Sequence, residues 1–368
     1  MIISLLISLI LVPDFNGPAT IAQNQPELRT FADSIRFFDG HEFEVIGKYH
    51  DEQNYVRFPA KYENTLRENV WNLGQNSAGI SIRFSTNAST IVVRWTVLND
   101  ANLLHMPATG VKGVDLYTHS NGNWQYVKTG FPKDKTNEST LLDGGDGQTR
   151  EFLLNLPLYD GVENLAIGIN EGAQISKPHQ NYLTRNKPVV YYGTSIAQGG
   201  CASRPGLAFT NILSRKIDRP IINFGFSGNG TIETSVGEAM CEIDAALFVI
   251  DCNPNTKPEL IYDRTVALIQ MLKKQRPGIP VLLVEGFMYE GSYFNPGSGV
   301  QELVIRKQNE LKRAFDTLKK SGTTKLFYKD GDGLIGNDHE GTVDGVHPND
   351  IGMLRIAEAL TPVLKKIL

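Results

Sequence analysis

The sequence contains little cysteine and no strong excess of charge of either sign, and each scarcity excludes a class of protein. Its three cysteines, Cys201, Cys241 and Cys252, are too few for a disulfide framework, and their spacing matches no zinc motif. We interpret them as three buried thiols, with one disulfide and a leftover thiol as the alternative. The formal net charge of −4 argues against nucleic acid or an anionic membrane as the partner.

Long apolar runs are also scarce. The run at residues 2–12 is too short to span a bilayer, and small residues follow at Thr20 and Ala22, as at a cleavage site. This pattern predicts a signal peptide over residues 1–22 and export to the periplasm or the cell exterior. A buried N-terminal strand is the alternative interpretation. We predict no membrane span elsewhere.

The sequence has the composition of a globular protein, with 41% hydrophobic and 21% charged residues. The pattern of its hydrophobic residues divides the chain after the N-terminal segment into two parts. Up to about residue 175, short segments such as 79–84 and 90–97 alternate with a period of two. Asn121-Gly122 between two such segments is a strong hairpin signal. No convincing helical period occurs there. These features predict an all-β, jelly-roll-like antiparallel sandwich domain over residues 27–180.

After Pro188 the hydrophobic pattern changes to short apolar runs separated by helix-length segments. Helical spacing is clear in 207–217, in 300–320 and in the last segment of the chain, and the apolar runs lie at 189–192, 221–224, 246–250, 281–284 and 325–328. Strands that alternate with helices predict a parallel sheet covered on both faces, a three-layer α/β/α domain over residues 186–368. In such sheets the ligand binds outside the carboxyl ends of the strands.

Two of the loops there carry the side chains that acyl transfer needs. Ser195 follows the first strand, and Asp344 and His347 precede the last helical segment. A serine hydroxyl becomes a good nucleophile when an imidazole accepts its proton, and a carboxylate fixes the tautomer of that imidazole. The short spacing lets Asp344 reach Nδ1 of His347 while Nε2 points at Ser195. Each segment alone is typical of an ordinary turn, so the prediction depends on their joint placement.

Other loops at this edge offer donors for an oxyanion. The glycine-rich loop 225–230 can aim a backbone N–H, and Asn253 and Asn255 can offer side-chain amides. His339 is the second candidate for the base, and Cys201 or Cys252 is a less favoured nucleophile. Arg204 and the polar loop 290–295 are unranked candidates to border the pocket. We interpret the other histidines as structural or surface groups: His41, His50, His105, His119 and His179.

These segments resemble the SGNH (GDSL-type) hydrolases. The resemblance rests on residues 193–196, Gly228, the Asn-Pro-Asn loop at 253–255 and the Asp-x-x-His motif at 344–347. The longer segment 192–206 is similar to one exported bacterial branch, in which a preceding β-sandwich carries a Gly-x-Asp-Leu-Tyr signature. This chain has Gly-Val-Asp-Leu-Tyr at 113–117. The resemblance spans nearly the whole mature chain and implies a flavodoxin-like hydrolase fold.

The resemblance also implies roles for individual residues. Ser195 would be the nucleophile, His347 the general base and Asp344 its orienting carboxylate. The oxyanion hole would consist of the Ser195 and Gly228 N–H groups and the side chain of Asn255, which matches the pattern of the branch, with Asn253 from the general alignment as the alternative. The family's usual aspartate before the serine is Thr194 here, and its Gly-x-Asn-Asp block is replaced by 251–255. No metal or cofactor is implied.

The predicted activity is that of an exported serine ester hydrolase acting on a small-molecule or polysaccharide ester. An exported enzyme with a companion sandwich suggests removal of acetyl groups from carbohydrate through an acyl-enzyme, which is an analogy at the level of the fold. The alternatives are an acyltransferase, a thioesterase or a lipase with the same triad, and an inactive carbohydrate-binding protein.

Overall fold

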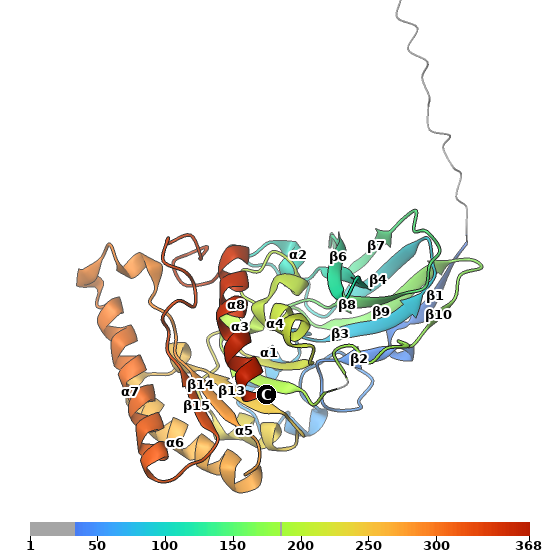
Figure 1. The fold of residues 1–368 in the computed structure, drawn as a ribbon. Helices are drawn as coiled ribbons and strands as arrows, with labels where there is room; N and C mark the ends of the chain where they lie inside the picture. Colours follow the sequence, from blue (N-terminus) through green and yellow to red (C-terminus); the bar gives the residue numbers. More distant parts are fainter. Residues whose placement is uncertain (1–33, 185) are drawn as a thin grey trace, which may run out of the picture. The chain divides into compact units, whose positions relative to one another are not determined.

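The computed structural model describes residues 34–184 and 186–368, which contain an antiparallel β-region followed by a parallel one (Figure 1). The predicted signal peptide at 1–22 lies outside the described residues. Within the described residues, no helix is both long and apolar enough to cross a membrane. The domain boundaries at 27–180 and 186–368 stay predictions.

The first region is a sandwich of two antiparallel sheets, as predicted. One sheet has the order β1-β9-β4-β7, with bounds Ile35–Asp39, Val162–Asn170, Ile91–Val97 and Thr136–Leu142. The other has the order β10-β3-β8-β5-β6, with β2 beside β3, and bounds Ile175–Ser176, Ser81–Thr86, Arg150–Asn155, Val114–Ser120, Asn123–Gly130 and Glu44–Ile46. Alternate residues of β4, among them Val93 and Trp95, are buried in the core between the sheets. The jelly-roll type of this sandwich stays a prediction.

The predicted hairpin joins β5 and β6. Its two turn residues, Asn121 and Gly122, have φ angles of 51° and 78°. Positive φ at both central positions is the requirement of a type I′ turn, which asparagine and glycine tolerate best. The dipeptide therefore specified this connection locally.

Two short helices in this part of the chain contradict the expectation that it has no helical segment. They are α1 (Glu68–Gly74) and α2 (Ala108–Val111), preceded by the 3-10 turn η2 (Ala60–Tyr62). At 7 and 4 residues, neither is long enough for a 3.6-residue period to repeat visibly. Apolar residues in and before α1, including Phe58 and Val70, pack against Tyr192 and Phe224 of the parallel region.

The second region is a five-stranded, wholly parallel sheet, as predicted. Its order is β12-β11-β13-β14-β15, with bounds Ile221–Gly225, Val189–Gly193, Leu247–Asp251, Val281–Val284 and Leu326–Lys329. In sequence order this is the 2-1-3-4-5 arrangement of flavodoxin-like folds. The order reverses beside β11, so the loops after β11 and β13 flank the position where such folds bind ligands.

Helices cover both faces of this sheet (Figure 1). Alternate strand residues such as Val189 and Tyr191 pack against α4 (Phe209–Ile217) and α8 (Asp350–Ile367). Their neighbours Val190 and Tyr192 lie in a second core, which three helices cover: α5 (Thr234–Cys241), α6 (Pro258–Gln275) and α7 (Val300–Lys320). Burial on both faces explains why these strands appear in the sequence as continuous apolar runs.

The Gly-x-Asp-Leu-Tyr segment binds the two regions together. Asp115, which is fully buried on β5, accepts hydrogen bonds from Arg204 Nη1 at 2.6 Å and from the Gly206 backbone N–H at 2.9 Å. Arg204 Nη1 also donates to the Tyr117 hydroxyl at 2.6 Å. Arg204 and Gly206 belong to the loop that follows α3 (Ser195–Gln198). The signature of the sandwich therefore fixes a loop of the parallel region, and Arg204 does not lie free at a pocket.

A second buried connection holds the end of β12. The guanidinium of Arg57 donates to the carbonyl oxygens of Asn223 at 3.2 Å and Gly225 at 2.5 Å, and to that of Asn76 at 3.0 Å. Burial lowers the pKa of Arg57 to about 9. Because buried carbonyl groups need donors, this side chain stabilises the strand end from which the loop 225–230 extends.

Candidate active site

The turn that carries Ser195 is tightly packed. β11 ends at Gly193, Thr194 caps α3, and Ser195 is the first residue of that helix. A Cβ atom on Gly193 would lie 2.6 Å from the Ala197 side chain, and one on Gly230 would lie 2.0 Å from the Gly193 carbonyl oxygen. Both positions therefore need glycine, and their close approach fixes the place of the serine.

The structure brings Ser195, His347 and Asp344 together. Ser195 Oγ lies 3.0 Å from His347 Nε2, and His347 Nδ1 lies 2.7 Å from Asp344 Oδ2. Since a carboxylate can only accept a hydrogen bond, Nδ1 carries the proton and Nε2 offers its lone pair to the serine hydroxyl. This is the geometry in which an imidazole acts as a base toward a serine.

Asp344 is held in place by the backbone of its own turn. Its Oδ1 accepts hydrogen bonds from the N–H groups of His347 at 2.7 Å and Val346 at 3.0 Å. Partial burial would raise the pKa of Asp344, but the hydrogen bonds from His347 and Val346 outweigh burial and hold that pKa below its usual value. The carboxylate is therefore ionised at the pH at which a neutral imidazole can act.

Glu290 supports the loop that carries the histidine. Its carboxylate accepts hydrogen bonds from the Thr342 hydroxyl and, at 3.3 Å, from the Gly341 N–H, and its own N–H donates to the Gly345 carbonyl at 3.0 Å. Glu290 is itself buried. Of the polar loop 290–295, this residue thus acts as a support for the turn at 341–347.

The candidate oxyanion donors differ in their surroundings. Gly228 is exposed with a φ of 66°, and Arg67 holds the next residue by donating to Asn229 Oδ1 at 2.6 Å. Asn253 and Asn255 lie on the 3-10 turn η4 (Asn253–Asn255) directly after β13. Asn253 is buried, and its Nδ2 has no hydrogen-bond partner among the described residues, whereas the buried unpartnered atom of Asn255 is Oδ1.

His105 lies at the site, although we interpreted it as a structural or surface group. It is exposed on the loop between β4 and α2, and the centroid of its ring is 5.3 Å from that of His347. Cys201 is close to both rings, with its Sγ and one nitrogen of each histidine all within 4.8 Å of one another. No local sequence signal marks His105, because its position depends on how the loops of the two regions pack.

The alternative catalytic groups are less well placed. His339 makes ring contacts with Tyr293 at 4.9 Å and Phe294 at 6.4 Å between centroids, and no described contact joins it to Ser195. Burial raises the pKa of Cys201 to about 12 and that of Cys252 well above its usual value. Because the thiolate is the nucleophilic form, buried and protonated thiols are poor candidates. All three cysteines are free and buried, as predicted.

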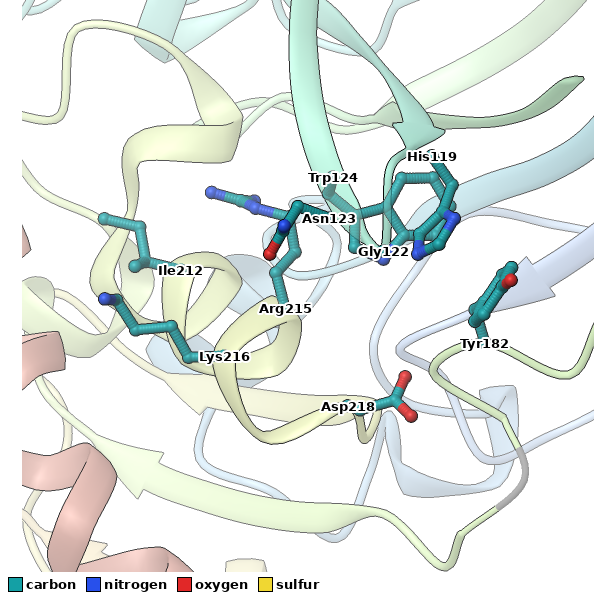
Figure 2. A pocket seen from close by; sticks show the side chains of 9 residues that line it. All are labelled: His119, Gly122, Asn123, Trp124, Tyr182, Ile212, Arg215, Lys216 and Asp218. Atoms are coloured by element: carbon teal, nitrogen blue, oxygen red, sulfur yellow. The ribbon is translucent and has the colours of Figure 1, made fainter.

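A cavity of about 560 Å³ lies away from this site (Figure 2). The rings of His119, Trp124 and Tyr182 form one side, and Lys216 of α4 forms another. Since α4 ends just before β12 begins, the cavity lies at the amino edge of the parallel sheet, opposite the edge where Ser195 follows β11. It is therefore not the pocket for a group that reacts with Ser195.

The fold and the relation of Ser195 to His347 define a carboxylic ester hydrolase. Residues 186–365 match the GDSL-like lipase/acylhydrolase family, and residues 35–175 match the GxDLY family, the N-terminus of SGNH-hydrolase-type esterases. The chain belongs to the GDSL-like lipase/acylhydrolase family. The same conclusion follows from a GDSL-like lipase of Bacteroides ovatus with 36% identity and a TM-score of 0.87, an alignment that covers 91% of this chain and 98% of that one.

More distant solved structures share the fold. The salicylyl-acyltransferase SsfX3 from a tetracycline biosynthetic pathway is 15% identical with a TM-score of 0.72, covering 90% of this chain and 97% of its own. The acetyl xylan esterase Est2A from the rumen bacterium Butyrivibrio proteoclasticus is 9% identical with a TM-score of 0.56, covering 90% and 98%. No curated protein matches the chain in sequence.

Proposed function

We propose that this esterase removes acetyl groups from carbohydrate after export, with Ser195, His347 and Asp344 as its catalytic triad. The hydrogen-bonded series from Ser195 Oγ to His347 Nε2 at 3.0 Å, and from Nδ1 to Asp344 Oδ2 at 2.7 Å, carries the proposal. The fold of an acetyl xylan esterase supports the choice of acetyl and sugar. Export rests on the signal predicted over residues 1–22.

The proposed reaction has two acyl-transfer steps. Ser195 Oγ attacks the ester carbonyl while His347 Nε2 takes its proton. The C–O bond of the tetrahedral intermediate then breaks, and the sugar oxygen takes that proton from His347 and leaves as a hydroxyl group. A water molecule attacks the resulting acyl-enzyme with His347 again as the base. The proton taken from water passes from His347 to Ser195 Oγ, and acetic acid leaves and ionises to acetate. Asp344 keeps its charge throughout and stabilises the imidazolium.

The oxyanion of each intermediate needs N–H donors in fixed positions. We propose the backbone N–H groups of Ser195 and Gly228 together with the side chain of Asn253. Asn253 is supported over Asn255 because its unpartnered buried atom is Nδ2, a donor, whereas the unpartnered Oδ1 of Asn255 could only accept. A buried donor without a partner is destabilising in the free enzyme, and an oxyanion would satisfy it.

Asn253→Ala is expected to lower kcat by about 10²–10³-fold, the usual effect of removing one oxyanion donor. Asn255→Ala is the matched control and should lower kcat much less, because the buried unpartnered atom of Asn255 is an acceptor, not a donor. Both variants should be assayed for kcat and KM on a small acetyl ester, with circular dichroism to verify folding. A larger loss in Asn255→Ala would restore the assignment that the sequence favoured.

Acetyl specificity is tested with p-nitrophenyl esters of increasing chain length and with acetylated oligosaccharides. We expect kcat/KM to fall at least about tenfold from acetyl to butyryl, since one misplaced methylene changes binding by roughly 1–3 kcal/mol. Acetate should be released from the acetylated sugars. A preference for octanoyl or longer esters would contradict the acetyl proposal while leaving the triad intact.

An acyltransferase is the second candidate, favoured by the shared fold of SsfX3. The two activities differ in which acceptor attacks the acyl-enzyme. Reactions run with an added sugar alcohol should yield free acetate if the enzyme is a hydrolase. Acetylated acceptor as the main product would establish transfer instead.

A further inference from the structure

Three potential metal ligands meet at the active site from three separate loops. His105 comes from the loop between β4 and α2, Cys201 from the loop after α3, and His347 from the turn before α8. One ligand atom of each lies within 4.8 Å of the other two. We propose that this trio binds a zinc-class divalent cation, and that the bound cation reversibly blocks the catalytic base.

The donor set is the one that zinc prefers. Imidazole nitrogen and cysteine sulfur bind Zn²⁺ at about 2.0–2.1 Å and 2.3 Å, and three protein ligands leave a fourth position for water or the Ser195 hydroxyl. In a tetrahedron with those bond lengths the ligand atoms are roughly 3.5 Å apart. The observed separations of up to 4.8 Å therefore need to close by about 1.3 Å at most, and the exposed His105 side chain is the ligand with the most freedom to move.

Two of the three ligands are already fixed in place. Cys201 is buried with a φ of 71°, and the neighbouring Ser203 N–H donates to Asp350 Oδ1 at 2.8 Å. His347 presents Nε2 to the site because Nδ1 faces Asp344 at 2.7 Å. A carboxylate behind a ligating histidine is the usual supporting partner of zinc ligands, since it orients the ring and strengthens its basicity. Cys201 and His347 are thus held without the cation, whereas His105 would have to move toward them.

Binding of the cation would inhibit the proposed reaction by blocking one atom of the catalytic base. The cation would occupy the Nε2 lone pair of His347, which otherwise accepts the Ser195 proton. The Cys201 thiol would release one proton as its sulfur bonds to the cation, so binding should strengthen as pH rises. This inhibitory consequence rests on the proposed function, whereas binding of the cation does not.

The test uses the whole protein, stripped of metal and titrated with Co²⁺ as a spectroscopic substitute for Zn²⁺. We expect a single site with tetrahedral cobalt bands, a thiolate-to-cobalt charge-transfer band, and release of one proton per cation. Cys201→Ser should abolish the charge-transfer band. His105→Ala should weaken Zn²⁺ binding by at least about 100-fold in a competition titration, since loss of an outer-shell partner alone costs roughly 10–100-fold. Cys241→Ser and exposed His179→Ala are the matched controls and should behave as wild type.

Inhibition is measured separately, on a small ester with increasing ZnCl₂. Zinc should inhibit the wild-type enzyme, EDTA should restore activity, and His105→Ala should need about 100-fold more zinc. Absence of the charge-transfer band, or equal zinc affinity in wild type, Cys201→Ser and His105→Ala, overturns the proposal. If the cobalt signature is present but no ester is hydrolysed, the proposed function fails and the metal site stands.

Discussion

Ser195→Ala is expected to lower kcat by about 10⁵–10⁶-fold, the loss seen when a triad nucleophile is removed. The substitution deletes Oγ, the atom that lies 3.0 Å from His347 Nε2 and that would carry the acyl group in the proposed reaction. It removes one hydroxyl from a nearly buried residue, so stability should change little. Steady-state kinetics on an acetyl ester and labelling by a fluorophosphonate probe measure the effect.

Ser235→Ala is the matched control, because Ser235 lies on α5, outside both turns that carry the proposed triad. It should keep both activity and labelling. Residual activity in Ser195→Ala above roughly a hundredth of the wild-type rate would indicate another nucleophile. Labelling that persists without Ser195 would lead to the same conclusion. Wild-type protein that neither labels nor hydrolyses esters would support an inactive binding protein.

Asp344→Asn is expected to lower kcat by about 10⁴-fold with little change in fold. The amide oxygen can still accept the N–H groups of Val346 and His347, now bonded to Oδ1. The amide nitrogen, however, faces Nδ1 where Oδ2 was, and two donors cannot pair. The imidazole must then place its proton on Nε2, where it cannot accept a proton from Ser195.

The pH dependence of stability offers a second readout for Asp344. Its pKa is lowered in the folded protein, so its ionised form contributes stability above the unfolded pKa of about 4, and the contribution is lost as pH falls through the folded pKa. Asp344→Asn should therefore flatten the acid side of the curve of unfolding free energy against pH.

For the loss of kcat, Asp338→Asn is the matched control, because Asp338 pairs with Arg355 at 2.6 Å beside the alternative base His339. An equal kcat loss in Asp338→Asn would contradict the assignment.

The elements that sequence patterns predicted well are those whose contacts repeat along one segment. The helical period over 300–320 corresponds to α7, and the Asn121-Gly122 turn needs only its own two residues. By contrast, α1 is too short to show a period, and its place depends on packing against Phe224 of a distant strand. Local patterns therefore predicted a long helix and a β-turn with specific residue requirements. They missed a short helix whose position depends on residues far away in the sequence.

The same distinction applies to the site. Ser195 and His347 were predictable as neighbours because loops that follow parallel strands meet at one edge of the sheet. His105 was not, because it reaches the site from a loop of the sandwich, where neither spacing nor residue type indicates a partner. The proposal of Asn253 for the oxyanion hole also depends on the structure, since sequence alone cannot tell which asparagine has a buried donor without a partner.

The bonds from Asp115 to Arg204 and Gly206 bear on how such a chain can evolve. A module joined by a flexible linker can be exchanged by gene fusion without harm to its neighbour. Here the buried Asp115 of the sandwich accepts hydrogen bonds from Arg204 and from the Gly206 N–H of the hydrolase segment. A hydrolase segment separated from its sandwich would therefore keep this loop but lose the carboxylate that holds it. The two coding segments should therefore be inherited, duplicated and lost as a pair.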